Sequence, residues 1–370
     1  MAKTKRNSAI DMLKVISIYF IILHHYALWS GWQFTSGFSL TKTAAQTLLM
    51  GGKLGVDIFV MITGYFVIRS TAKVKSLVTI WIETTLISLT VYFVMVGFHL
   101  GGVTFSLHDF VLDALPILFA RYWFVTAYTL LYFSIPILNN VFLRISNAAR
   151  LRMLTVMFVL FSLVPLLFYE KGMTFSFPIW FMFLYLVGAY LRLNADDLKK
   201  ISKIKLWLLL GLLSAVSIAA NIFLQWALST GGRLKQIITF LGWNETVFYT
   251  RDASPLMLLM AVVIMLLVMQ MTLSPKPFVQ YLTRAAFGVY LLQSSPVFST
   301  NFLWPTVVNA KRFTSGGVII GYGLFVAAVI YIVGSILYSV LFPIRQLVLK
   351  IINQPIIKVQ QWFSKVKIDD

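Results

Sequence analysis

Four side chains with acid–base chemistry lie inside long apolar stretches of the chain: Lys14, His25, Asp57 and Glu83. A charge at the middle of a bilayer costs about 2.5–3.5 kcal/mol, so such groups usually serve function or support it. Lys14 and His25 are eleven residues apart, which at about 100° per residue places them on one face of a helix, about three turns apart in height. We therefore expect this face to carry a cation near one membrane surface and an imidazole deep in the membrane.

His25 is the candidate general base, because imidazole exchanges a proton near neutral pH. Asp57 is predicted at a similar depth in the next apolar stretch, and a carboxylate there would orient the ring and raise its basicity. From position alone, a packing histidine hydrogen-bonded across the helix bundle is an equally good interpretation. No metal site is expected, because the chain has four histidines and no cysteine, and adjacent His24 and His25 cannot both face one ion from a single helix.

A second group of charged residues is predicted at the inner third of the membrane. It consists of Lys14, Arg69, Lys73, Lys75 and Glu83. Such a cluster suits a phosphorylated ligand from the cytoplasm, although the general enrichment of Lys and Arg on the inner side explains it equally well.

Polar and aromatic residues elsewhere could support an acceptor. Trp123 and Phe124 open an apolar stretch at the predicted outer face, where aromatic residues commonly form an interfacial belt. Tyr290 and Gln293 are predicted near mid-depth, where an amide must find hydrogen-bond partners. Packing explains these four residues as well as chemistry does.

The composition indicates how these residues must be held. Of 370 residues, 59% are hydrophobic and 12% are charged, which excludes an ordinary water-soluble globule, in which about a quarter of residues carry charge. About 20 apolar residues are needed for a helix to cross the hydrocarbon core. The sequence predicts an all-α polytopic integral membrane protein with about ten transmembrane helices, at 12–33, 46–68, 77–99, 122–143, 151–169, 175–193, 205–228, 253–272, 285–304 and 316–342.

Loop charges predict the orientation of these helices. With the first residues inside, 21 of the 31 lysines and arginines fall in inner segments and 8 in outer ones, which is the distribution expected for cytoplasmic loops. Both termini are therefore predicted in the cytoplasm, and the net charge of +19 reflects topology and not a nucleic-acid partner. Residues 1–342 form the predicted transmembrane domain, and 343–370 form a basic cytoplasmic tail on the anionic lipid leaflet.

Two outer segments are expected to carry short helices. Residues 107–120 are too short and too charged to span, which indicates an interfacial or re-entrant helix. Residues 229–252 mix aromatic and polar side chains, which favours an interfacial helix over a substrate lid.

Four segments in order resemble the membrane acyltransferase family 3, whose members O-acylate surface polysaccharides and related glycans. The first runs from Arg6 through Lys14 to His24-His25-Tyr26, with Lys14 where the family usually has Arg. The others are Gly52–Tyr65, Tyr122–Asn139 and Phe287–Leu292. Two features depart from the family pattern: Gln293 stands where many members have His, and Lys73 and Lys75 stand where many members have a paired-Arg motif.

The resemblance implies an acyl-coenzyme A donor, most simply acetyl-CoA, as co-substrate on the cytoplasmic side. It also implies a glycan or polysaccharide hydroxyl as acceptor on the outer side of a bacterial plasma membrane, and a place beside surface-polysaccharide biosynthesis proteins. In this mechanism Lys14, Arg69 and their neighbours hold donor phosphates, and His25, supported by Asp57, acts as general base. No bound cofactor is expected.

Two other functions fit parts of the pattern. Intramembrane charges and glycine-broken spans also occur in transporters and flippases for lipid-linked sugars, although no inverted repeat is visible. A polysaccharide polymerase would need a large outer loop with arginines or paired carboxylates, and only Arg233, Glu245, Arg251 and Asp252 offer these groups.

Overall fold

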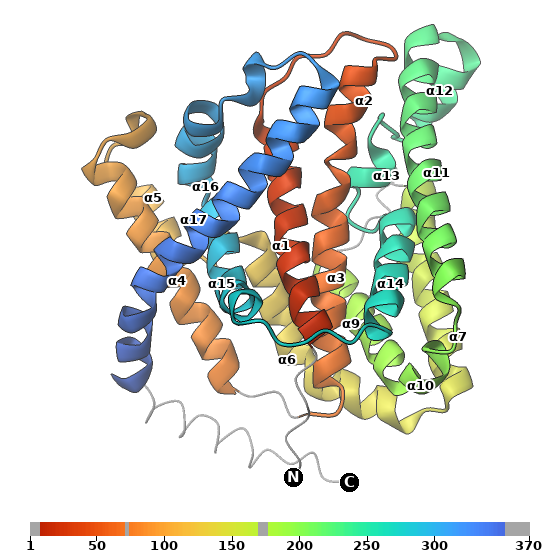
Figure 1. The fold of residues 1–370 in the computed structure, drawn as a ribbon, viewed down its shortest axis with the longest axis horizontal. Helices are drawn as coiled ribbons and strands as arrows, with labels where there is room; N and C mark the ends of the chain where they lie inside the picture. The colour runs from red at the N-terminus through yellow and green to blue at the C-terminus, as the bar shows by residue number, and fades with distance from the viewer. Residues whose placement is uncertain (1–7, 71–73, 169–176, 352–370) are drawn as a thin grey trace.

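A computed structural model describes residues 8–70, 74–168 and 177–351 of the chain. Their regular structure is helical, and no strand occurs among them. The helices form a bundle whose long members run between two ends (Figure 1). The all-helical prediction is therefore confirmed for the described part of the chain.

Seven helical stretches among the described residues are long and apolar enough to cross a membrane. They are α1 (Ser8–Trp29), α2 with α3 (Leu40–Thr47 and Met50–Val67), α4 (Val74–Gly97), α6 (Trp123–Arg144), α7 continued by α8 (Asn147–Phe158 and Val164–Phe168), α11 (Lys203–Thr230) and α17 (Gly316–Ile351). Three shorter helices, α9 (Phe177–Leu193), α14 (Pro255–Met269) and α15 (Pro277–Ser294), overlap the remaining predicted spans. Each of the ten predicted ranges thus meets a helix, while the number that cross the membrane stays a prediction.

The start of α1 and the end of α17 lie toward the same, lower end of the bundle in Figure 1, as an even number of spans requires. The assignment of that end to the cytoplasm stays a prediction from the loop charges. The short helices α12 (Gly232–Phe240) and α13 (Val247–Thr250) fall within the predicted outer segment 229–252, and α5 (Leu107–Ala114) falls within 107–120. Both segments therefore carry the short helices that the sequence predicts.

Glycines allow α3 to pack closely against α1 on one face and α9 on another. A Cβ atom on Gly52 would lie 2.4 Å from the His24 ring, and one on Gly55 would lie 2.5 Å from the Ser17 carbonyl oxygen. On the other face, a Cβ on Gly188 of α9 would lie 2.0 Å from the Met61 carbonyl oxygen. Small residues at such contacts bring helix backbones together, so these glycines determine the position of α3.

Two helices differ most from their predicted ranges. The helix predicted at 285–304 begins at Pro277 and ends at Ser294, because Pro296 lacks an N–H to continue the ladder, and π-helical turns follow over Ser299–Val308. The tail predicted to begin at residue 343 starts as a continuation of α17, which runs through Pro343 to Ile351. The rest of that tail, 352–370, lies outside the described residues.

Candidate functional site

His25 lines a cavity of about 320 Å³ near the upper end of α1. Trp123, Phe124 and Tyr290 line the same cavity, so the structure brings these predicted residues together with the predicted base. The Trp29 ring stacks on His25 with centroids 4.4 Å apart. The outer cavity, as we call it, is therefore lined by two imidazoles, those of His24 and His25, and by several aromatic rings.

Gln293 is the hydrogen-bond partner of His25. The Nδ1 atom of His25 lies 2.7 Å from the Gln293 Oε1 atom, and the Gln293 amide donates to Ser294 Oγ at 2.7 Å. Because the amide oxygen only accepts, Nδ1 carries the hydrogen and the lone pair is left on Nε2. This is the tautomer in which Nε2 can take a proton.

The predicted contact between His25 and Asp57 is wrong. Asp57 is buried, and its Oδ1 accepts a hydrogen bond from Trp180 Nε1 of α9 at 3.2 Å. Gly55 faces α1, and Asp57 follows it by two residues, or about 200° around the helix, so the carboxylate points to the opposite side. Similar depth in the membrane does not determine which face of a helix a side chain occupies.

Lys53 and Arg121 also line the outer cavity, and neither is among the functional residues that the sequence predicts. Lys53 donates to Asp252, and its ammonium lies 5.6 Å from the Trp123 ring centroid. Arg121 is paired with Asp113 at 3.2 Å. The position of Lys53 within a predicted apolar span is the feature of the sequence that could have marked it as a functional residue.

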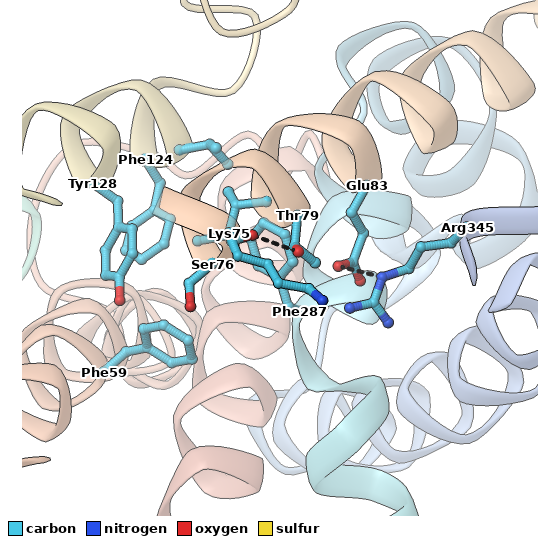
Figure 2. A pocket seen from close by; sticks show the side chains of 11 residues that line it. Phe59, Lys75, Ser76, Thr79, Glu83, Phe124, Tyr128, Phe287 and Arg345 are labelled. Atoms are coloured by element: carbon cyan, nitrogen blue, oxygen red, sulfur yellow. Dashed lines mark hydrogen bonds and ion pairs between the residues drawn. The ribbon is translucent and has the colours of Figure 1, made fainter. Parts of the chain in front are cut away.

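A larger cavity, of about 490 Å³, opens between α4, α6 and α17 and is called the inner cavity here. Figure 2 shows its charged groups, Lys75, Glu83 and Arg345, gathered toward one side and the aromatic rings of Phe124 and Tyr128 toward the other. Arg345 Nε lies 3.3 Å from Glu83 Oε2. The cavity is therefore amphipathic, with cations at one end and rings at the other.

Glu83 is held from two positions on α17, Arg345 and Tyr338. The Tyr338 hydroxyl donates to Glu83, and Arg345 NH1 donates to the Tyr338 oxygen at 3.3 Å. A Cβ on Gly288 would lie 2.1 Å from the Tyr338 ring, so glycine at that position of α15 leaves room for this tyrosine. The sequence places Arg345 in the predicted tail, because no local pattern links it to Glu83.

The other predicted cations are divided among different places. Lys14 lines a third cavity of about 330 Å³, together with Arg284, and lies 3.7 Å from Asp11. Arg69 is exposed just beyond the end of α3 and is not among the residues that line these cavities. Lys73 lies outside the described residues. Apart from Arg69, the described members of the cluster predicted at the inner third therefore line two adjoining cavities, which share Phe59, Tyr128 and Phe287.

Aromatic rings separate the outer cavity from the inner one. Phe124 lines both cavities, and its ring centroid is 5.3 Å from that of Tyr290 and 5.7 Å from that of Phe59. Phe59 also lines the third cavity. The outer cavity, the inner cavity and the third cavity thus meet at one group of rings inside the bundle.

This architecture defines a multi-pass membrane protein with a candidate base and candidate anion-binding groups on opposite sides of an aromatic partition. Residues 7–343 match a family model described as an acyltransferase domain, and the chain belongs to this acyltransferase family 3. It is accordingly an acyltransferase enzyme, and membership decides against the transporter and polymerase interpretations. No curated protein and no solved structure matches the chain.

Proposed function

We propose that this enzyme moves an acyl group, most simply acetyl, from cytoplasmic acyl-CoA to a hydroxyl of a cell-surface or exported polysaccharide, in a bacterial plasma membrane. The observation that carries the proposal is the position of Phe124, which lines both the chamber with His25 and the chamber with Lys75 and Arg345. A donor and an acceptor held in the two chambers would meet at this ring.

The inner cavity supports the donor half of the proposal. Coenzyme A carries phosphates at one end and a narrow thiol-bearing arm at the other. Lys75 and Arg345 supply cations for the phosphates, and the arm would extend past Phe287 toward Phe124. Lys14 and Arg284 in the third cavity offer a second basic position, and Arg69 and Lys73 remain candidates at the cytoplasmic surface.

The outer cavity supports the acceptor half. In the proposed step, Nε2 of His25 takes the proton of the acceptor hydroxyl while its oxygen attacks the thioester carbonyl carbon. The resulting tetrahedral intermediate collapses, the carbon–sulfur bond breaks, and the imidazolium returns the proton to the leaving thiolate. The products are an ester and free coenzyme A, and a positioned base of this kind contributes about 10²–10⁴-fold in rate.

Gln293 takes the orienting role that Asp57 was expected to have, because it holds Nδ1 of His25. Asp57 instead supports the site by joining α3 to α9 through Trp180. The amide is neutral, so it selects the tautomer of His25 without adding a charge to the cavity.

The test compares surface glycans from a deletion strain complemented with the native enzyme, with His25→Ala or with His108→Gln. His108 is an exposed histidine at the surface, with a side chain 80% accessible, and serves as the matched control. We expect ester-linked acyl groups, measured by NMR and mass spectrometry, to be lost with His25→Ala and kept with His108→Gln. Full acylation in His25→Ala, at equal membrane abundance, would contradict the proposed base.

A further inference from the structure

The charges that line the outer cavity are all of one sign. Among its described lining residues, Lys53 and Arg121 are the cations and no carboxylate is present. The carboxylates that pair with them, Asp252, Asp109 and Asp113, are not among the lining residues. A ligand in this cavity would therefore contact the cations directly, whereas the carboxylates that pair with them do not line the cavity.

Arg121 is not available for exchange with a ligand. Its guanidinium contacts both oxygens of Asp113, at 3.3 and 3.2 Å, and Asp109 at 3.3 Å. Asp113 is 1% exposed and also accepts from Ser88. A carboxylate held in this way cannot turn to water, so the Arg121 pairs fix the start of α6 against α5.

Lys53 has a different environment. Asp252, its partner, is 46% exposed on its side chain, whereas Lys53 is 15% exposed. The Lys53 ammonium also lies 5.6 and 5.8 Å from the ring centroids of Trp123 and Phe177, which are themselves 4.3 Å apart. Asp252 can turn to water while Lys53 stays in the cavity wall, so an incoming anion can take the place of this carboxylate.

A second lysine on the same helical stretch gives the contrast. Lys42 of α2 pairs with Glu245 at 2.5 Å, and its side chain is only 7% exposed. The other oxygen of Glu245 accepts from Gln46 at 3.0 Å. Lys42 is almost inaccessible to solvent, and both carboxylate oxygens of Glu245 have partners. This pair joins α2 to the segment before α13, so it has a structural role that the Lys53 pair does not share.

We propose that Lys53 binds an anionic substituent of the acceptor, so that the preferred acceptor is a sugar whose ring carries a carboxylate or phosphate near the acylated hydroxyl. Trp123 and Phe177 would pack against the apolar face of the ring while His25 reaches the hydroxyl. The inference rests on the proposed function, because it assigns a substrate class to the same cavity. It makes Lys53 a specificity-determining residue.

The test uses purified enzyme, radiolabelled acetyl-CoA, and two probes that differ at C6, phenyl β-D-glucuronide with a carboxylate and phenyl β-D-glucoside with a hydroxymethyl group. Products acylated at the 6-hydroxyl of the glucoside are separated and counted apart. We expect Lys53→Gln to raise KM for the glucuronide about tenfold, as loss of one charged contact predicts, and to leave the glucoside nearly unchanged. Lys53→Arg should keep the preference, and Asp252→Asn should lower KM for the glucuronide by removing the competing carboxylate. Lys42→Gln should lower thermal stability without changing the preference.

Two results would overturn the inference. An equal fall of kcat for both probes in Lys53→Gln would show that Lys53 stabilises the oxyanion of the intermediate and not the acceptor. An unchanged ratio of the two KM values would show that it does not contribute to selection.

Direct binding separates this inference from the proposed function. Equilibrium dialysis of labelled glucuronide without acetyl-CoA, compared between the native enzyme and Lys53→Gln, measures the contribution of Lys53 to binding without the transfer step. Binding that depends on Lys53, without any acyl transfer, would support the proposed anion site. The same result would contradict the proposal that the enzyme transfers acyl groups to such sugars. Transfer to both probes, with binding that does not depend on Lys53, would sustain the transferase and refute the anion site. Absence of Lys53-dependent binding in any case counts against the inference.

Discussion

The outer and inner cavities differ in how their charges are satisfied. In the outer cavity a neutral amide, Gln293, holds His25, and the carboxylates lie behind the wall. In the inner cavity Glu83 is itself a lining residue, beside Lys75 and Arg345 (Figure 2). A neutral partner keeps an imidazole free to exchange a proton, whereas a charged network fixes cations in position to hold an anion. The comparison indicates that the outer cavity is suited to the chemical step and the inner cavity to binding an anionic donor.

The loss of the Gln293 contact is expected to have the largest effect among the variants that leave His25 in place. Gln293→Leu removes the acceptor for Nδ1, so the ring loses its fixed tautomer and orientation, and kcat should fall about 10–100-fold. Gln293→His, which installs the residue usual in the family, should retain more activity than Gln293→Leu. Steady-state assays with equal amounts of folded enzyme measure kcat for each variant. A wild-type kcat in Gln293→Leu would show that His25 does not need Gln293, and would contradict the distinction drawn between the two cavities.

A change in the inner cavity should affect the donor and not the chemical step. Arg345→Ala removes one cation and leaves Glu83 with the Tyr338 hydroxyl, so KM for acyl-CoA should rise about tenfold while kcat changes little. Arg345→Lys should recover part of the loss, and Lys350→Ala, at an exposed position of α17, is the matched control. A fall in kcat with unchanged KM would place Arg345 in the chemical step.

The smallest effect is expected at Asp57. Asp57→Asn retains an oxygen that can accept from Trp180, so the contact between α3 and α9 survives and kcat should stay within about threefold of wild type. Asp57→Leu removes the acceptor and should lower the thermal stability of the detergent-solubilised enzyme. A hundredfold loss of kcat in folded Asp57→Asn would indicate that Asp57 contributes to catalysis, and would contradict the conclusion that Gln293, and not Asp57, supports His25.

The sequence by itself determined the class of protein and its candidate base. Apolar runs of span length depend only on local composition, so each of the ten predicted ranges meets a helix. The spacing of Lys14 and His25 is a property of one helix, and the four ordered motifs led to the family that the match over residues 7–343 confirms. Local patterns suffice for such features because they do not depend on how helices pack.

Only the tertiary structure decided which side chains act together. The partner of His25 is 268 residues away, and one partner of Glu83, Arg345, lies beyond the predicted end of the last helix. Asp57 is turned toward α9, because Gly51, Gly52 and Gly55 of α3 pack against α1 and set the rotation of the helix. Depth along a helix can be counted from residue numbers, whereas its rotation and its neighbours follow from close packing between segments distant in the sequence.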